Sequence, residues 1–242
     1  SCTIYERGHT FVSEHAFHAR RCDEKKSSMT LLKKLFPASW HYALSNVKRM
    51  VFGYMKYSQF GEDAVLIELF KDKNDGRYVD VGAHHPYRYS NTYLLYKKGW
   101  HGVNIDPNQH TIKLFDKARP NDKNICSGVG RAGMFTYYRF SDPAVNTFKK
   151  EEAEKWKGKS FLKFFGTTDV EIKPLSEMVD GPIDLLTVDA EGMDLEVLQS
   201  YDWKNYPKVV VIEGNESQQF LSHKGYTLHA ERGVSRIYVH EN

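Results

Sequence analysis

Short apolar runs rich in β-branched residues alternate with segments of helical period through most of this 242-residue chain. The apolar runs are residues 78–81, 102–105, 124–128, 183–189 and 209–213. This alternation is typical of βαβ units, in which a helix crosses back over the sheet between two parallel strands. It predicts an α/β fold with a mostly parallel sheet.

The end of the chain and one long insertion depart from this alternation. Residues 226–230 and 236–240 flank a turn around Gly233 and predict an antiparallel hairpin. Helices are expected at 91–98 and at 195–201. Between the third and fourth strands, residues 135–179 contain a strand-like run at 135–140, a charged helix near 150–157, and Phe161, Phe164 and Phe165 in a basic setting. These rings either frame an acceptor or belong to the core.

Length, charge and cysteine content limit the class of protein. With 40% hydrophobic residues, the chain can bury one large core, so we expect one α/β domain over 57–242 after an N-terminal extension over 1–56. A net charge of +3 is too small to indicate a nucleic-acid partner. Three widely spaced cysteines favour a reducing, cytoplasmic location. No apolar run approaches the roughly 20 residues of a membrane-spanning helix.

The N-terminal extension contains a basic, amphipathic segment. No acidic residue occurs between residues 25 and 61, whereas lysines and an arginine alternate there with apolar residues. One interpretation is a pair of helices that contact the inner face of an anionic membrane through residues 25–56. The other is a helical lid whose apolar face packs on the domain.

The first predicted strand ends in an acidic residue and a glycine turn, Asp80-Val81-Gly82-Ala83. The carboxyl end of a strand in an open α/β sheet is where a nucleotide-like cofactor binds, and glycine allows close approach of the backbone. The second strand ends at Asp106, at about the spacing where an acid holds the hydroxyls of a ribose. The sequence therefore predicts a site for an adenosine-containing cofactor.

The residues of this glycine turn distinguish between two kinds of adenosine-containing cofactor, a dinucleotide and S-adenosylmethionine. A dinucleotide site needs a G-x-G-x-x-G turn that rests a pyrophosphate on a helix, but here Ala83, His84, His85 and Pro86 follow Gly82. The antiparallel ending also suits a seven-stranded methyltransferase sheet. We therefore expect S-adenosylmethionine, with a nicotinamide-dependent oxidoreductase and a non-catalytic cofactor- or glycan-binding module as the alternatives.

Three motifs together resemble the FkbM family of methyltransferases. They are residues 57–63 (Tyr-Ser-Gln-Phe-Gly-Glu-Asp), residues 80–83 (Asp-Val-Gly-Ala) and residues 188–192 (Val-Asp-Ala-Glu-Gly). The resemblance implies a class I, Rossmann-like methyltransferase fold, and O-methylation of a glycan or small-molecule hydroxyl, often in a surface polysaccharide. It implies these cofactor contacts: Gln59, Glu62, Asp63, Asp80, Gly82, Ala83, Asp106, Cys126 and Ser127.

Methyl transfer to a hydroxyl requires removal of a proton. His84 follows the glycine turn and ordinarily titrates near neutral pH, so we expect the rim formed by His84, Asp189 and Glu191 to contain the base. Asp189 and Glu213 end adjacent strands and offer oxygen ligands to magnesium or calcium. Alternatively, Asp189 binds the cofactor and Glu213 orders a loop. The oligomeric state is left open.

Overall fold

The computed structural model describes residues 57–241. The predicted N-terminal arm and basic helices fall on residues 1–56, outside the described part, so membrane contact through residues 25–56 remains a prediction. Between residues 57 and 241, no helix is long and apolar enough to cross a membrane.

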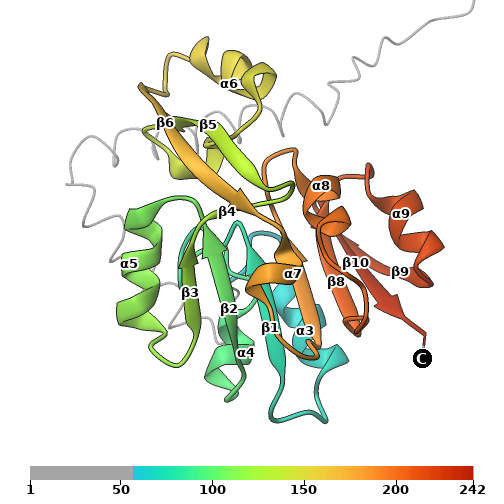
Figure 1. The fold of residues 1–242 in the computed structure, drawn as a ribbon. Coiled ribbons are helices and arrows are strands. Elements are labelled where there is room, and N and C mark those ends of the chain that lie inside the picture. The colour runs from blue at the N-terminus through green and yellow to red at the C-terminus, as the bar shows by residue number, and fades with distance from the viewer. Residues whose placement is uncertain (1–56, 242) are drawn as a thin grey trace, which may run out of the picture. The chain divides into compact units, whose positions relative to one another are not determined.

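A seven-stranded sheet forms the centre of the described residues (Figure 1). Its strands are β3 (Lys123–Cys126), β2 (His101–Asp106), β1 (Arg77–Val81), β7 (Leu185–Val188), β8 (Val209–Glu213), β10 (Ser235–His240) and β9 (Tyr226–Arg232), in that spatial order. The first five are parallel, and the final hairpin pairs antiparallel with β8. The predicted α/β fold with a mostly parallel sheet and an antiparallel C-terminal hairpin is confirmed.

Helices cover both faces of this sheet because alternate strand residues point to opposite faces. One face packs on α7 (Leu175–Met178), α8 (Asp194–Gln199) and α9 (Gln218–His223). The opposite face packs on α3 (Glu62–Leu69) and α4 (Tyr93–Lys97). In β1, for example, Val79 and Val81 belong to the first core and Tyr78 to the second. A further helix, α5 (Gln109–Ala118), connects β2 to β3.

The insertion between β3 and β7 forms a second, three-stranded sheet. Its strands are β4 (Gly128–Val129), β6 (Phe164–Lys173) and β5 (Gly133–Phe140), with the short helix η1 (Pro143–Val145) and α6 (Lys150–Lys157) between β5 and β6. Figure 1 shows it beyond the upper edge of the large sheet, where β1, β2 and β7 end.

Two features of this insertion differ from the sequence-based expectation. The third strand expected at 124–128 is present as β3 but ends earlier, at Cys126. The chain leaves the large sheet at Ser127, whose hydroxyl donates to the carbonyl of Glu171 (3.1 Å), and begins β4 at Gly128. The strand β6 was not predicted. Of its ten residues only Ile172 is buried, and apolar and polar residues alternate only over 169–173, a run too short to predict the whole strand.

Candidate active site

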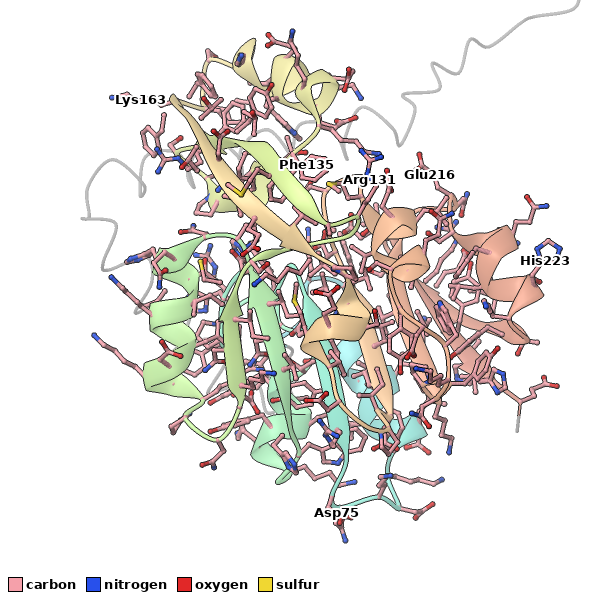
Figure 2. The ribbon with its side chains drawn as sticks, viewed as in Figure 1. Asp75, Arg131, Phe135, Lys163, Glu216 and His223 are labelled. Carbon is pink, nitrogen blue, oxygen red and sulfur yellow. The ribbon has the colours of Figure 1, made fainter. Side chains whose placement is uncertain are left out.

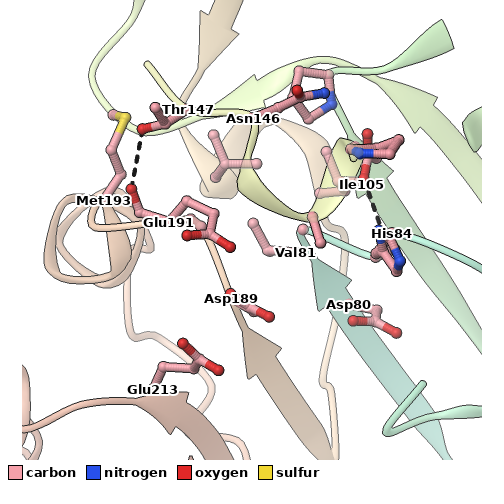
Figure 3. Close-up of a pocket in the computed structure, with 18 of the residues that line it drawn as sticks. Asp80, Val81, His84, Ile105, Asn146, Thr147, Asp189, Glu191, Met193 and Glu213 are labelled. Carbon is pink, nitrogen blue, oxygen red and sulfur yellow. Dashed lines mark hydrogen bonds between the residues drawn. The ribbon is translucent and has the colours of Figure 1, made fainter. Parts of the chain in front are cut away.

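A cavity of about 380 Å³ opens at the carboxyl edge of the seven-stranded sheet. Parallel strands deliver their last residues to the same edge, and the three-stranded sheet supplies the opposite wall. Figure 3 shows carboxylates from β1, from β8 and from the loop that follows β7 around this space. The predicted site residues that line it are Gln59, Asp80, Gly82, Ala83, His84, Asp106, Ser127, Asp189, Glu191 and Glu213.

Gly82 is required at the end of β1 for a reason that the sequence does not reveal. Its φ is +74°, and a Cβ there would lie 1.7 Å from the carbonyl oxygen of Asp189 on the neighbouring segment. The amides of Gly82 and Ala83 both donate to the carbonyl of Ile105 (2.9 and 3.2 Å). The glycine therefore allows β1, β2 and β7 to converge closely, and these two amides already have protein partners.

Asp106 ends β2 with its carboxylate held by two backbone amides. The amide of His84 donates to Oδ2 (3.0 Å) and that of Asn108 to Oδ1 (2.7 Å). Burial raises the pKa of Asp106 to about 6, and the two amides oppose that rise. Because each carboxylate oxygen can accept two hydrogen bonds, both retain capacity for hydroxyl donors.

Asp80 connects the cavity to a buried polar network. The hydroxyl of Thr92 donates to Asp80 Oδ2 (2.7 Å) and accepts from Arg119 Nη1 (2.8 Å). Burial raises the pKa of Asp80 to about 6, which the hydrogen bond from Thr92 opposes. Arg119 is fully buried and also donates to the carbonyl of Pro86 and the hydroxyl of Ser90. One arginine thus ties together the segment that carries His84 and the carboxylate of Asp80.

The two adjacent histidines have different environments. His84 has a φ of +54°, stacks on Tyr89 with ring centroids 6.0 Å apart, and lines the cavity. Its Nε2 is buried and has no hydrogen-bond partner among the described residues, and burial followed by Arg88 lowers its pKa. His85 does not line the cavity; its Nδ1 accepts from the amides of Tyr87 and Arg88. Its pKa is lowered to about 4, mainly by burial. Both rings are therefore neutral at pH 7.

Three carboxylates face one another on the opposite wall of the cavity (Figure 3). Burial raises the pKa of Asp189 well above its ordinary value, and Glu213 and then Glu191 raise it further. Burial and then Glu213 raise the pKa of Glu191 to about 8. Burial also raises the pKa of Glu213. Because the three acids lie close together, the negative charge of each destabilises the ionised form of the others. A ligand with positive charge would relieve this repulsion, so the cavity favours such a ligand.

Some residues that the resemblance placed at the cofactor lie outside the main cavity. Glu62 accepts from the hydroxyl of Ser235 (2.7 Å) and the amide of Phe60 (2.8 Å) and borders a small adjoining cavity of about 20 Å³. Asp63 accepts from the amide of Tyr57 (2.6 Å). Cys126 is exposed and does not line the cavity. The contacts of Glu62 and Asp63 order the segment that carries Gln59.

Other residues of the site were missed by sequence reasoning. Asn91 donates through Nδ2 to the hydroxyl of Thr187 (3.0 Å), and both line the cavity together with Tyr89 and Asn146. Thr187 is a polar residue within an otherwise apolar strand, which is a signal that the sequence does contain. For the loop residues Tyr89 and Asn146, no periodicity or motif marks their position.

The described residues do not include a preformed multi-ligand metal centre. Between residues 57 and 241, no group of three or more His, Cys, Asp or Glu side chains is arranged to hold a metal ion. The expected pair, Asp189 and Glu213, does line one cavity.

The strand order and the acidic cavity define the class of protein. A sheet with five parallel strands and an antiparallel final hairpin, open at its carboxyl edge, is that of a class I S-adenosylmethionine-dependent methyltransferase. The family model described as the methyltransferase FkbM domain matches residues 80–231. The chain therefore belongs to the FkbM methyltransferase family.

Solved structures with a related arrangement are distant in sequence. The FkbM methyltransferase from Methylobacillus flagellatus KT is 12% identical with a TM-score of 0.45, and the match covers 69% of this chain and 44% of that one. A putative caffeoyl-CoA O-methyltransferase from Staphylococcus aureus is 12% identical, with a TM-score of 0.43 and coverages of 90% and 99%. A TehB-like methyltransferase from Corynebacterium glutamicum ATCC 13032 is 13% identical, with a TM-score of 0.40 and coverages of 84% and 98%. Comparison with curated proteins gives no match.

Proposed function

We propose that this chain transfers the methyl group of S-adenosylmethionine to a hydroxyl oxygen of a carbohydrate or a comparably polar small molecule. The observation that carries the proposal is the gathering of five carboxylates around one cavity: Asp80, Asp106, Asp189, Glu191 and Glu213. S-adenosylmethionine carries a sulfonium, an ammonium and a ribose diol, and carboxylates suit all three. The volume of about 380 Å³ lies in the range of small-molecule sites.

Different walls of the cavity are assigned to different ends of the cofactor. Asp106 receives the ribose hydroxyls, because its oxygens are oriented by amides and keep free lone pairs. Ser127 lies where the adenine would follow, and Gln59 and Asp80 lie on the side of the methionine end. Asp189 faces the positive charge at the centre.

The acceptor is assigned to the wall formed by Glu191, Glu213 and the exposed rings of Phe60 and Tyr89. Carboxylates accept hydrogen bonds from sugar hydroxyls, and aromatic rings pack on the apolar face of a sugar. This wall also disfavours an anionic acceptor, because it already carries several acids. A neutral polyol or sugar therefore fits it best.

The bound cofactor supplies an electrophilic methyl carbon. The protein aligns the acceptor oxygen, excludes water and takes up the hydroxyl proton. We assign the proton acceptor to the rim of His84, Asp189 and Glu191. His84 offers a neutral ring, whereas Glu191 offers a carboxylate whose pKa of about 8 makes it a stronger base than an ordinary one.

The test is methyl transfer from labelled S-adenosylmethionine to a panel of neutral sugars and polyols, with the product identified by mass spectrometry. We expect an O-methyl ether, and His84→Ala or Glu191→Gln to lower kcat by about a hundredfold, depending on which is the base. For a base, kcat increases with pH as the group loses its proton. An inflection below pH 6.5 assigns the base to His84, and an inflection near pH 8 assigns it to Glu191. Asp75→Asn, exposed at the opposite end of the sheet in Figure 2, is the matched control.

Two outcomes would redirect the proposal. If the protein binds S-adenosylmethionine but methylates only amines or thiols, the hydroxyl assignment is wrong. If EDTA abolishes turnover and magnesium or calcium restores it, Asp189 and Glu213 are assigned as ligands of an ion that activates the hydroxyl, and the role of the base diminishes.

A further inference from the structure

A cluster of exposed aromatic and basic side chains lies at the outer end of the three-stranded sheet. We call it the basic aromatic tip and define it as Lys157, Lys159, Phe161, Lys163, Phe164 and Phe165, between α6 and the first residues of β6. Figure 2 shows Lys163 at the end of the insertion that is farthest from the large sheet. None of these residues lines the cavity, so the tip has no part in the site described above.

The aromatic rings of the tip are unusually exposed for their size. Phe161 is 75% exposed, Phe165 is 54% exposed and Phe164 is 36% exposed. Phenylalanine is among the residues that folding most often buries, and several exposed within five residues form a patch rather than isolated surface positions. Phe164 still contacts Phe140, with ring centroids 5.3 Å apart, which anchors one ring of the tip to β5.

The charge of the tip is positive and partly unpaired. Residues 157–165 contain three lysines and no acid. Lys157 pairs with Glu154 (2.7 Å), but neither Lys159 nor Lys163 forms an ion pair among residues 57–241. The lysines also lie beside the rings: Lys157 Nζ is 4.5 Å from the centroid of Phe164, and Lys163 Nζ is 5.9 Å from that of Phe165.

This combination selects among the partners that could cover the tip. A soluble polyanion would engage the lysines and leave the rings in water. A second copy, or the basic residues 25–56 of the same chain, would bring like charges together. A bilayer with anionic headgroups satisfies both features, because phenyl rings enter the boundary between headgroups and acyl chains while lysines remain among the phosphates.

We propose that the basic aromatic tip docks this protein on a membrane surface that contains anionic lipids. The contact is peripheral: the rings enter the interface and the protein stays on one side of the bilayer. It is independent of the proposed methyl transfer, since it uses no residue of the cavity.

The test is cosedimentation of the full chain with phosphatidylcholine vesicles, with and without phosphatidylserine. We expect binding only with phosphatidylserine, and a loss of at least tenfold in affinity for Phe161→Ser/Phe165→Ser and for Lys159→Glu/Lys163→Glu. The matched controls keep wild-type binding: Met134→Ser, an exposed apolar residue at the other end of the hairpin, and Lys113→Glu/Lys117→Glu, two exposed lysines of α5. Unchanged S-adenosylmethionine affinity verifies that each variant is folded.

A second measurement locates the contact. The fluorescence that Phe161→Trp adds to that of the four native tryptophans should be quenched by brominated lipid in phosphatidylserine vesicles, whereas the fluorescence that Met134→Trp adds should not. Wild-type vesicle binding by the Phe161→Ser/Phe165→Ser variant would overturn the proposal and assign any membrane contact to another segment. Equal binding of that variant and the wild type to polyphosphate, with no vesicle binding by either, would assign the lysines to a soluble polyanion instead.

Discussion

At the scale of single residues, the site depends on how each carboxylate is held. Asp106 accepts a backbone amide on each oxygen, so its side chain is oriented before any ligand binds. Preorganised, charge-assisted hydrogen bonds of this kind are stronger than neutral ones, because no reorientation is needed when the partner arrives. No backbone amide within residues 57–241 orients the carboxylate of Glu191, and its pKa of about 8 reflects burial beside other acids.

Asp106→Ala should weaken S-adenosylmethionine binding by tenfold or more, which corresponds to about 1.4 kcal/mol or more. The substitution removes the proposed acceptor for the ribose hydroxyls and also frees the amides of His84 and Asn108. Calorimetry measures the affinity, with Asp75→Asn as the exposed control. An affinity within twofold of the wild type would remove Asp106 from the ribose site.

At the scale of elements, a buried arginine fixes the loop between β1 and α4. Arg119 follows α5 and reaches across to the carbonyl of Pro86 and the hydroxyls of Ser90 and Thr92. Its guanidinium carbon also lies 5.0 to 5.5 Å from the ring centroids of Phe115, Tyr93 and Tyr96. The planar, multidentate guanidinium suits this arrangement, whereas a lysine ammonium does not.

Arg119→Lys should therefore leave the protein folded but loosen the segment that carries His84, Tyr89 and Asn91. We expect S-adenosylmethionine affinity to fall about tenfold, measured well below the Tm of both proteins, together with a lower Tm. Arg77→Lys is the matched control, because Arg77 donates to the carbonyl of Asp180 at the other edge of the sheet. A lower Tm with unchanged affinity would show that Arg119 supports the core alone.

At the scale of the whole molecule, the acids of the cavity link folding to pH and ligand. Asp80 and Asp106 have pKa values of about 6 and Glu191 of about 8 in the folded protein. These values exceed those of the unfolded chain, so the folded state binds protons more tightly. The contribution of each carboxyl group to the free energy of unfolding is therefore full at low pH, and it is lost as the pH rises through the pKa of that group in the folded protein.

The Tm of the ligand-free protein should accordingly fall between pH 7 and pH 9, a window above the ordinary titration of the histidines. S-adenosylmethionine should raise the Tm more at pH 8.5 than at pH 7, because its positive charge favours the ionised carboxylates. Thermal denaturation measures both effects. Glu191→Gln should flatten the pH dependence, whereas Glu177→Gln, exposed and outside the cavity, should not. A slope that is the same in both variants would contradict this linkage.

Local sequence patterns determined most of the large sheet and the position of the site. Runs such as 209–213 are β-branched and apolar because both faces of a central parallel strand are buried, and that pattern is readable without a structure. Asp80, Asp106, Asp189 and Glu213 lie at or next to the carboxyl ends of neighbouring parallel strands, so the topology brings them to one edge. Patterns within a strand therefore predicted which side chains meet.

Only the tertiary structure decided the features that depend on contacts between distant segments. β6 is identified by pairing with β5, because its own side chains are largely exposed and only residues 169–173 alternate between polar and apolar. Position 82 requires glycine because the carbonyl of Asp189, more than 100 residues later in the chain, packs against it. The role of Arg119 depends on hydrogen-bond acceptors that lie about 30 residues earlier in the chain. Local sequence encodes propensity and periodicity, whereas steric exclusion and the pairing of buried polar groups exist only after the chain has folded.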